Sequence, residues 1–135
     1  MKTKEILKSQ QGFTLVEIIA VLIILGILAA VAVPRYIDLE QNARNRAIDA
    51  AVSELNGRES LIWADSKISA SGYIDDARVL TRINNTASGP DLGNDYVWSG
   101  VPTAGGGSVS FKGGTAVALT RTASTSTQPA TWRKP

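Results

Sequence analysis

The pattern of apolar and polar positions begins with an unusually long apolar run. Sixteen consecutive apolar or glycine residues extend from Ile18 to Val33, and between Phe13 and Val33 only Thr14 and Glu17 interrupt it. A helix over residues 13–33 would be roughly 30 Å long, which matches the hydrocarbon thickness of a bilayer. A helix packed in a soluble core would instead carry a polar stripe. We therefore expect a membrane-spanning helix.

Basic residues followed by an apolar run are also typical of a cleaved secretory signal or a simple signal anchor. Three features favour a different kind of segment. Glu17 lies within the apolar run, where a carboxylate costs on the order of a few kcal/mol and needs a dedicated partner. The polar residues Gln10 and Gln11 precede the run, whereas a secretory signal is cut after its apolar segment. The run also leads directly into Pro34 and a further helical pattern.

Beyond Pro34 the helical pattern resumes, because a proline inside a long helix removes one hydrogen bond and bends the helix without ending it. Residues 38–46 are polar nearly all round. The following positions carry an apolar stripe made of Ile48, Ala51, Val52, Leu55 and Ile62. We expect a nearly continuous helix from Phe13 to Lys67, roughly 80 Å long, ending between Lys67 and Ser71.

The C-terminal half has the composition of a small, glycine-rich β region. Residues 76–83 fit a short helix opened by Asp75 or Asp76, and residues 88–94 are a loop by composition. Short strands are expected at Tyr96–Trp98, Ser108–Lys112 and Ala116–Thr122. The tail from Ala123 is expected along the surface, with Trp132 as its anchor. The predicted class is α+β, with a long N-terminal helix packed on a small antiparallel β-sheet.

Two registers are possible for the hairpin around Gly113. A two-residue turn would pair Phe111 with Ala116, and would leave Val117 and Leu119 on the opposite face from the apolar residues of the first strand. A three-residue loop of residues 113–115 would pair Phe111 with Val117 and Val109 with Leu119. We prefer the second register, because it gathers the apolar side chains on one face, which would cover the apolar stripe of the helix.

Composition and charge narrow the range of functions. The chain carries 14 basic and 12 acidic residues, but Lys2, Lys4, Lys8 and Glu5 precede Phe13, which leaves eleven of each sign in the remainder. A neutral body argues against a nucleic-acid partner, because a strong grip on phosphate needs clustered Lys and Arg. The absence of Cys and His removes disulfides, thiol catalysis, the usual general base and the commonest metal ligand.

Carboxylates remain as candidates for chemistry, and two groups of them stand out. Asp75 and Asp76 are adjacent, but neighbouring acids at a turn are usually caps or solvated groups. Asp91, Asn94 and Asp95 form a scattered cluster that is more typical of turns than of a calcium site. Because nothing positions a nucleophile, we expect a protein without catalytic residues, cofactor or metal.

The residues Gly12, Phe13, Thr14, Leu15, Val16 and Glu17 resemble the processing motif of type IV prepilins and type II secretion pseudopilins. In that family a membrane peptidase cuts after the glycine, and the same enzyme methylates the new N-terminal Phe. The resemblance covers about Lys8 to Leu55. It implies cleavage between Gly12 and Phe13, N-methylation of Phe13, and a pilin lollipop with a leader at 1–12, a transmembrane and filament-core helix at 13–40, and a globular domain at 41–135.

The physical chemistry of this motif is consistent with that processing. A cut before Phe13 creates a positive amine that is unfavourable beside the start of a helix, and places Glu17 one turn on, where a negative charge is favourable. The two charges can neutralise each other within one chain. In the family, the equivalent of Glu17 in an incoming subunit meets the Phe13 amine of a neighbour, so that the buried pair sets the register. Both alternatives remain open. The resemblance also matches Gly26 and Pro34, where family helices loosen or kink.

The resemblance implies a structural subunit of a homo-oligomeric helical filament. Its partners would be membrane lipid before assembly, the prepilin peptidase and methyltransferase, and the inner-membrane assembly machinery; its location would change from the inner membrane to an extracellular pilus. Residues 33–39 are similar to pilins of the mannose-sensitive haemagglutinin type, which favours a pilus. The alternative is a pseudopilin of a type II secretion system, in a periplasmic pseudopilus. No acidic C-terminal loop like that of the major pseudopilin is recognised, and the disulfide of many pilins is absent.

Overall fold

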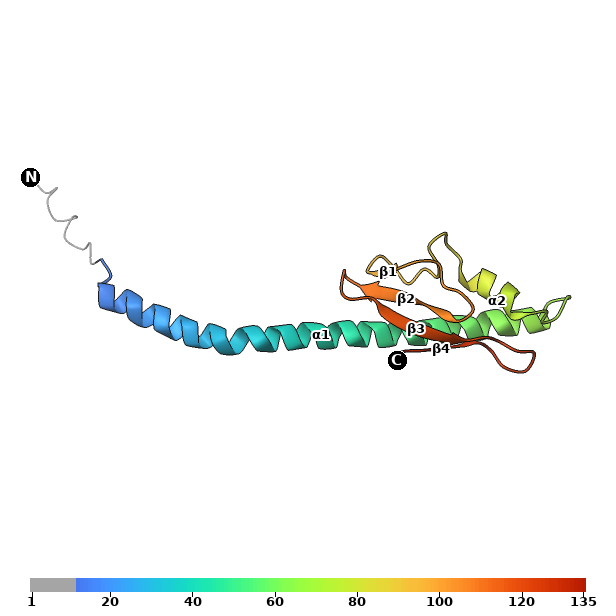
Figure 1. Cartoon of the computed structure of the whole chain (residues 1–135), viewed down its shortest axis with the longest axis horizontal. Coiled ribbons are helices and arrows are strands. Elements are labelled where there is room, and N and C mark those ends of the chain that lie inside the picture. The colour runs from blue at the N-terminus through green and yellow to red at the C-terminus, as the bar shows by residue number, and fades with distance from the viewer. Residues whose placement is uncertain (1–11) are drawn as a thin grey trace, which may run out of the picture. The chain divides into compact units, whose positions relative to one another are not determined.

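The computed structural model describes residues 12–135, which belong to two compact units divided between Glu40 and Gln41. The elements are α1 (Leu15–Ile68), α2 (Asp76–Ile83), β1 (Tyr96–Trp98), β2 (Gly106–Phe111), β3 (Val117–Thr122) and β4 (Thr131–Arg133) (Figure 1). One long helix with a small antiparallel sheet confirms the predicted α+β class and its pilin-like architecture.

Helix α1 is 54 residues long and continues through Pro34 and Gly57. Its last residue, Ile68, confirms the predicted end. Gly72 follows in the left-handed region at φ +64°, and its N–H donates to the carbonyl of Ser69 over 2.9 Å. A glycine adopts this conformation at little steric cost, which allows the chain to turn away from the helix axis.

The first part of α1 exposes its apolar side chains. From Phe13 to Val33 the large apolar residues are between 45% and 83% exposed. This part of the helix is long and apolar enough to cross a membrane, and none of its most apolar stretch is buried. A core helix of a soluble protein would be mostly buried, so these side chains find no cover within residues 12–135.

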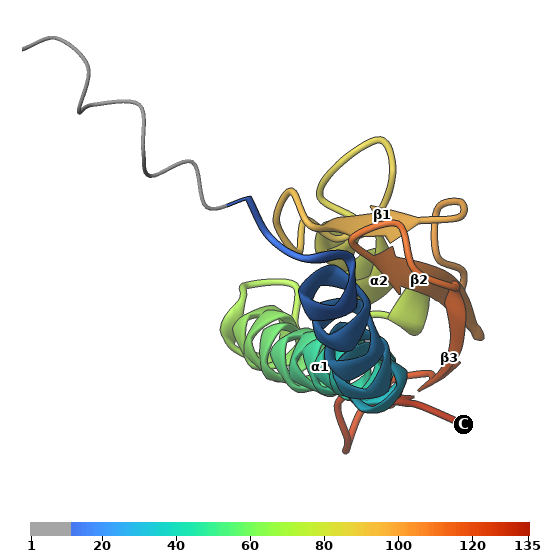
Figure 2. The same cartoon turned by 90° about the vertical axis from the view of Figure 1, so that its left-hand side faces the viewer.

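The second unit is built around the other half of α1. The sheet has the order β1-β2-β3-β4, all antiparallel, and it lies along one side of the helix (Figures 1 and 2). Its hydrophobic core consists of Ile48, Leu55, Ile83, Val109, Leu119 and Trp132. Of the predicted helix stripe, Ile48, Ala51 and Leu55 are buried, while Val52 and Ile62 pack partly buried against the core.

The hairpin between β2 and β3 keeps the predicted face but not the preferred register. Val109 pairs with Val117, and Gly107 pairs with Leu119, so the predicted pairing of Val109 with Leu119 was wrong by two residues. The reason is a tight turn in which Lys112 and Gly113 both have positive φ, at 48° and 68°. A shift of two residues preserves the face, because side chains alternate with a period of two.

The C-terminal tail is a strand as well as a surface segment. Residues 131–133 form β4, which the sequence pattern did not predict, because a strand of three residues is too short to show alternation. Trp132 is 1% exposed, which confirms it as the anchor of the tail. Asn56 of α1 clamps its backbone: Asn56 Nδ2 donates to the Trp132 carbonyl over 3.1 Å, and the Trp132 N–H donates to Asn56 Oδ1 over 2.6 Å.

Candidate functional site

The N-terminus of α1 is closed by a reciprocal cap between Thr14 and Glu17. The backbone N–H and the Oγ1 hydroxyl of Thr14 both donate to Glu17 Oε2 over 2.8 Å, and the Glu17 N–H donates to Thr14 Oγ1 over 3.2 Å. A Thr followed three residues later by a Glu is the sequence signature of a capping box, which satisfies otherwise free N–H groups in the first turn. The carboxylate is thereby folded back towards Phe13.

The two residues of the expected cleavage site lie just before this cap. Gly12 and Phe13 precede the first residue of α1, and Phe13 is 83% exposed. The structure thus brings Phe13 and Glu17 to the same end of the helix. Thr14 had no role in the predicted site, although its spacing of three residues from Glu17 is the signal of a capping box.

Gly26 and Pro34 both lie within α1. A Cβ added at Gly26 would meet nothing within 4 Å, so the chain itself imposes no steric need for a glycine there. Pro34 does not interrupt the helix. These two residues are far along the helix from the cap, and the site at the helix start therefore consists of Gly12, Phe13, Thr14 and Glu17.

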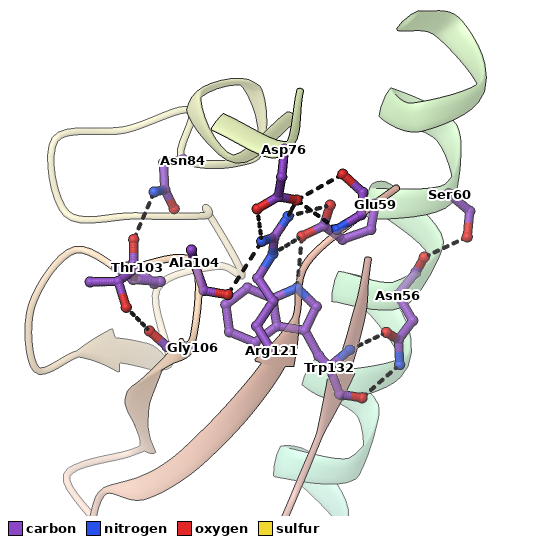
Figure 3. A network of polar contacts seen from close by, with 12 residues as sticks. Asn56, Glu59, Ser60, Asp76, Asn84, Thr103, Ala104, Gly106, Arg121 and Trp132 are labelled. Carbon is purple, nitrogen blue, oxygen red and sulfur yellow. Dashed lines mark hydrogen bonds and ion pairs between the residues drawn. The ribbon is translucent and has the colours of Figure 1, made fainter. Parts of the chain in front are cut away.

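A second polar cluster, centred on Arg121, is buried inside the body (Figure 3). Arg121 Nε donates to Glu59 Oε1 over 2.5 Å, and its Nη1 and Nη2 donate to Asp76 over 2.7 and 2.9 Å. Further bonds run from Nη2 to Glu59 Oε2 and from Nη1 to the Ala104 carbonyl. All five N–H groups of the guanidinium therefore have acceptors. Trp132 Nε1 also donates to Glu59 Oε1, over 3.0 Å.

This cluster is a structural ion-pair network and not an acid–base pair of carboxylates. Burial raises the pKa of Asp76, but hydrogen bonds from Arg121 and Ser124 outweigh it, so the pKa lies below its usual value. Burial lowers the pKa of Arg121, and the bonds to Asp76 and Glu59 raise it above its usual value. Asp75 instead caps α2, accepting from the Arg78 N–H over 2.9 Å. The adjacent acids thus have separate structural roles.

The oxygen cluster of the Asp91 loop also takes part in local structure. Asp91 Oδ1 accepts from the Gly93 N–H over 2.9 Å, and Asp95 lies 3.7 Å from Lys112. Within residues 12–135 no group of three or more acidic, His or Cys side chains is arranged to hold a metal ion.

Comparison with known proteins finds a family model that matches the N-terminal segment. Residues 7–33 match the family model of the prokaryotic N-terminal methylation motif. The chain is 37% identical over 57 residues to the type IV narrow pilus major component PilA5 of Thermus thermophilus, which is 42% of this chain and 49% of that protein. Two fimbrial proteins of Pseudomonas aeruginosa are each 38% identical over 66 residues, 48% of this chain and 43% of theirs. The chain therefore carries the N-terminal methylation motif and is similar over part of its length to pilus and fimbrial components.

The similarity covers only part of each pilin. The chain spans about half the length of the relatives it matches, and no solved structure matches it at comparable significance. The match to the methylation motif lies in the segment that contains the capped helix start.

Proposed function

We propose that this chain is the structural subunit of a type IV pilus-like filament. It enters the inner membrane through α1, loses residues 1–12 by cleavage after Gly12, receives a methyl group on the Phe13 amine, and polymerises through the N-terminal helix. Residues 13–40 then serve first as the membrane anchor and later as the filament core, and residues 41–135 form the globular domain. The subunit has no catalytic role of its own.

The observation that carries this proposal is a carboxylate at the start of an exposed apolar helix. Cleavage before Phe13 converts the peptide nitrogen of Phe13 into a cationic amine, at the end of the helix towards which Glu17 is folded. Within residues 12–135, Glu17 Oε2 accepts bonds from Thr14 while Oε1 accepts none. A carboxylate has room for further donors, so Glu17 of an incoming subunit can receive the Phe13 amine of a neighbour already in the filament.

A pilus is preferred over a secretion pseudopilus because the relatives named above are pilus and fimbrial components. The processing enzyme is a prepilin peptidase and methyltransferase, which the matched methylation motif supports. Gly26 and Pro34 are proposed to let α1 loosen in the filament, since glycine and proline are the residues that weaken or bend a helix.

The proposal is tested by the start of the mature chain and by the role of Glu17. Mass spectrometry of filaments sheared from cells should show a chain that begins at a methylated Phe13. Gly12→Ala should slow or block the cut, because the peptidase requires the glycine. Glu17→Val should still enter the membrane and be processed, but filament yield should fall at least about tenfold, since one unpaired buried charge costs more than 1.4 kcal/mol.

Asp95→Val is the matched control, because it removes a carboxylate whose ion pair is exposed on the body. Its filament yield should equal that of the unaltered chain. Normal filaments from Glu17→Val would remove the assignment of Glu17, and a mature chain that retained residues 1–12 would remove the proposed function itself.

A further inference from the structure

The two edges of the sheet differ in how their outward backbone groups are used. At the β4 edge, the N–H and the C=O of Trp132 are both bonded to the Asn56 side chain of α1. The β1 edge lies at the other end of the strand order β1-β2-β3-β4. One edge is therefore closed by the chain itself, and the other is the edge at which a further strand can add.

The bonds at the two ends of β1 show which backbone groups face β2. The Lys112 N–H donates to the Asp95 carbonyl over 2.8 Å, and the Ser99 N–H donates to the Ser108 carbonyl over 2.9 Å. Pairs of this kind alternate along an antiparallel ladder, so Val97, midway between Asp95 and Ser99, also turns its backbone groups to β2. The residues on either side of Val97 turn theirs to the outside of the sheet.

The outward backbone groups of β1 are largely unused. Tyr96 donates its N–H to the Gly93 carbonyl over 3.2 Å. Within residues 12–135, no hydrogen bond reaches the Tyr96 C=O, the Trp98 N–H or the Trp98 C=O. In chain order these groups are an acceptor, a donor and an acceptor, which is the pattern that the backbone of an added extended strand pairs with.

A groove beside this edge has room for such a strand. It has a volume of about 240 Å³ and lies between β1 and the loop of residues 86–93. Pro90 and Leu92 contribute apolar surface to it, and Val97 is 59% exposed on the strand. Residues 96–98 include neither Lys nor Pro, the residues that commonly protect an edge strand from addition of another strand.

The charge of the groove indicates which kind of peptide fits. Asp91 lines it; the Asp91 Oδ1 accepts from the Gly93 N–H, and its Oδ2 has no partner within residues 12–135. Of the described residues that line the groove, none is Lys or Arg, so a basic side chain complements it. A second copy of β1 would bring its own loop, with a second Asp91, into the same groove, whereas a single extended peptide would not.

We propose that the groove beside β1 binds an extended segment of a partner protein, which adds to the sheet as a further strand and places a Lys or Arg side chain near Asp91. Main-chain hydrogen bonds to Tyr96 and Trp98 supply the affinity, and alternate side chains supply the specificity. The inference does not rest on the proposed function, because it concerns the globular domain alone and its test needs no filament.

The first test uses peptides with methylated backbone nitrogens. The probe is a fluorescent peptide of alternating Val and Thr with one central Lys, and fluorescence anisotropy measures its binding to the detergent-held subunit. An added strand turns alternate N–H groups towards β1. N-methylation of the odd-numbered or of the even-numbered peptide residues should therefore act unequally: one set should weaken binding at least tenfold, and the other less than threefold.

Three results of this test would overturn the proposal. The first is equal weakening by the two methylated sets, and the second is no binding of the unmethylated peptide. The third is weaker peptide binding at higher concentrations of the subunit, which would show that a second copy occupies the groove.

The second test alters the edge itself. Val97→Lys should weaken peptide binding at least tenfold, because a charged side chain on an edge strand opposes addition of another strand. Thr120→Lys is the matched control, since Thr120 is exposed on the interior strand β3, and binding should stay within twofold. Both residues are exposed, so neither substitution should change the thermal midpoint of the subunit. Full binding to Val97→Lys would overturn the edge as the site.

Asp91→Asn tests the charge of the partner, because it keeps the oxygen that accepts from the Gly93 N–H. It should weaken binding of the Lys-containing peptide at least threefold and leave binding of a peptide with Thr in place of Lys unchanged. An equal effect on the two peptides would overturn the assignment of a basic side chain to Asp91.

Discussion

Two glutamates of the same helix have opposite surroundings. Glu59, in the body, is fully buried and is bonded to Arg121 and Trp132, residues 62 and 73 positions away along the chain. Glu17, in the exposed apolar part, is bonded only to Thr14 within the described residues. Both oxygens of the Glu59 carboxylate accept hydrogen bonds from Arg121 or Trp132. The Glu17 carboxylate is held at a helix start, where one of its two oxygens accepts no hydrogen bond within residues 12–135 and is available for the proposed filament contact.

The same contrast applies to the apolar residues of α1. In the second half of the helix, Ile48 and Leu55 are covered by strands and by α2, whereas the large side chains from Phe13 to Val33 are exposed within the described part of the chain, residues 12–135. Apolar side chains of the same kind are therefore buried in one part of α1 and exposed in the other. Burial in the body stabilises the folded subunit, and the exposed apolar surface of the N-terminal part is what the proposed membrane anchor and filament core would use.

The strongest test of this contrast breaks the buried network. Arg121→Met should cost about 3–5 kcal/mol of unfolding free energy, because it leaves Glu59 charged and buried without its partner. Unfolding by urea, followed by tryptophan fluorescence in detergent, measures the body alone, since Trp63, Trp98 and Trp132 all lie within it.

Lys112→Met is the matched control for Arg121→Met. It also removes a cation from an ion pair, but the Lys112 and Asp95 side chains are 60% and 57% exposed. Exposed pairs contribute at most about 1 kcal/mol. Similar losses from the two substitutions would show that burial of the Arg121 network is not what makes it stabilising.

A leucine in each half of α1 provides the second test. Leu55→Ala should destabilise the body by about 2–5 kcal/mol, because Leu55 is fully buried and its removal leaves a cavity. Leu25→Ala should change the unfolding free energy of the body by less than about 0.5 kcal/mol, since Leu25 is 55% exposed and lies outside the body. An equal loss from the two substitutions in the urea experiment would contradict the division between buried and exposed apolar surface.

Local patterns explain which features were predictable. The end of α1 near Ile68, the apolar face shared by Val109 and Leu119, and the anchor Trp132 follow from periodicity and composition, which depend on neighbouring residues. The cap of Thr14 on Glu17 is equally local, and its spacing predicts it once the capping-box pattern is considered.

Features that join distant parts of the chain were not predictable in this way. Glu59 follows Leu55 by one turn on the buried stripe, yet nothing local indicates that its partner is Arg121, or that Asp76 bonds to the same guanidinium from 45 residues away. The hairpin register depended on Lys112, a residue other than glycine whose backbone lies in the left-handed region. The periodicity of apolar residues carries no information about such a turn. Such long-range polar contacts are fixed only by the packed structure.

The smallest expected effect is the pH dependence of stability that arises from Asp76, the more exposed of the two carboxylates bonded to Arg121. Burial raises the pKa of Asp76, but the bonds from Arg121 and Ser124 hold it below its usual value, so the folded state favours the charged form. Since the folded pKa is depressed, Asp76 contributes stability above its unfolded pKa of about 3.9, and this contribution is lost as pH falls through the folded pKa. The unfolding free energy should therefore decline below about pH 5.

Asp76→Asn isolates this contribution, because it keeps the shape of the side chain and removes its titration. The variant should be less stable than the unaltered chain at pH 7, where Arg121 loses a charged acceptor, and the difference between them should shrink as pH falls below about 4. Urea unfolding at a series of pH values measures both slopes. If the difference in unfolding free energy stayed constant across that range, protonation of Asp76 would not be linked to unfolding. Glu59 would then be the only carboxylate of the network whose charge stabilises the fold.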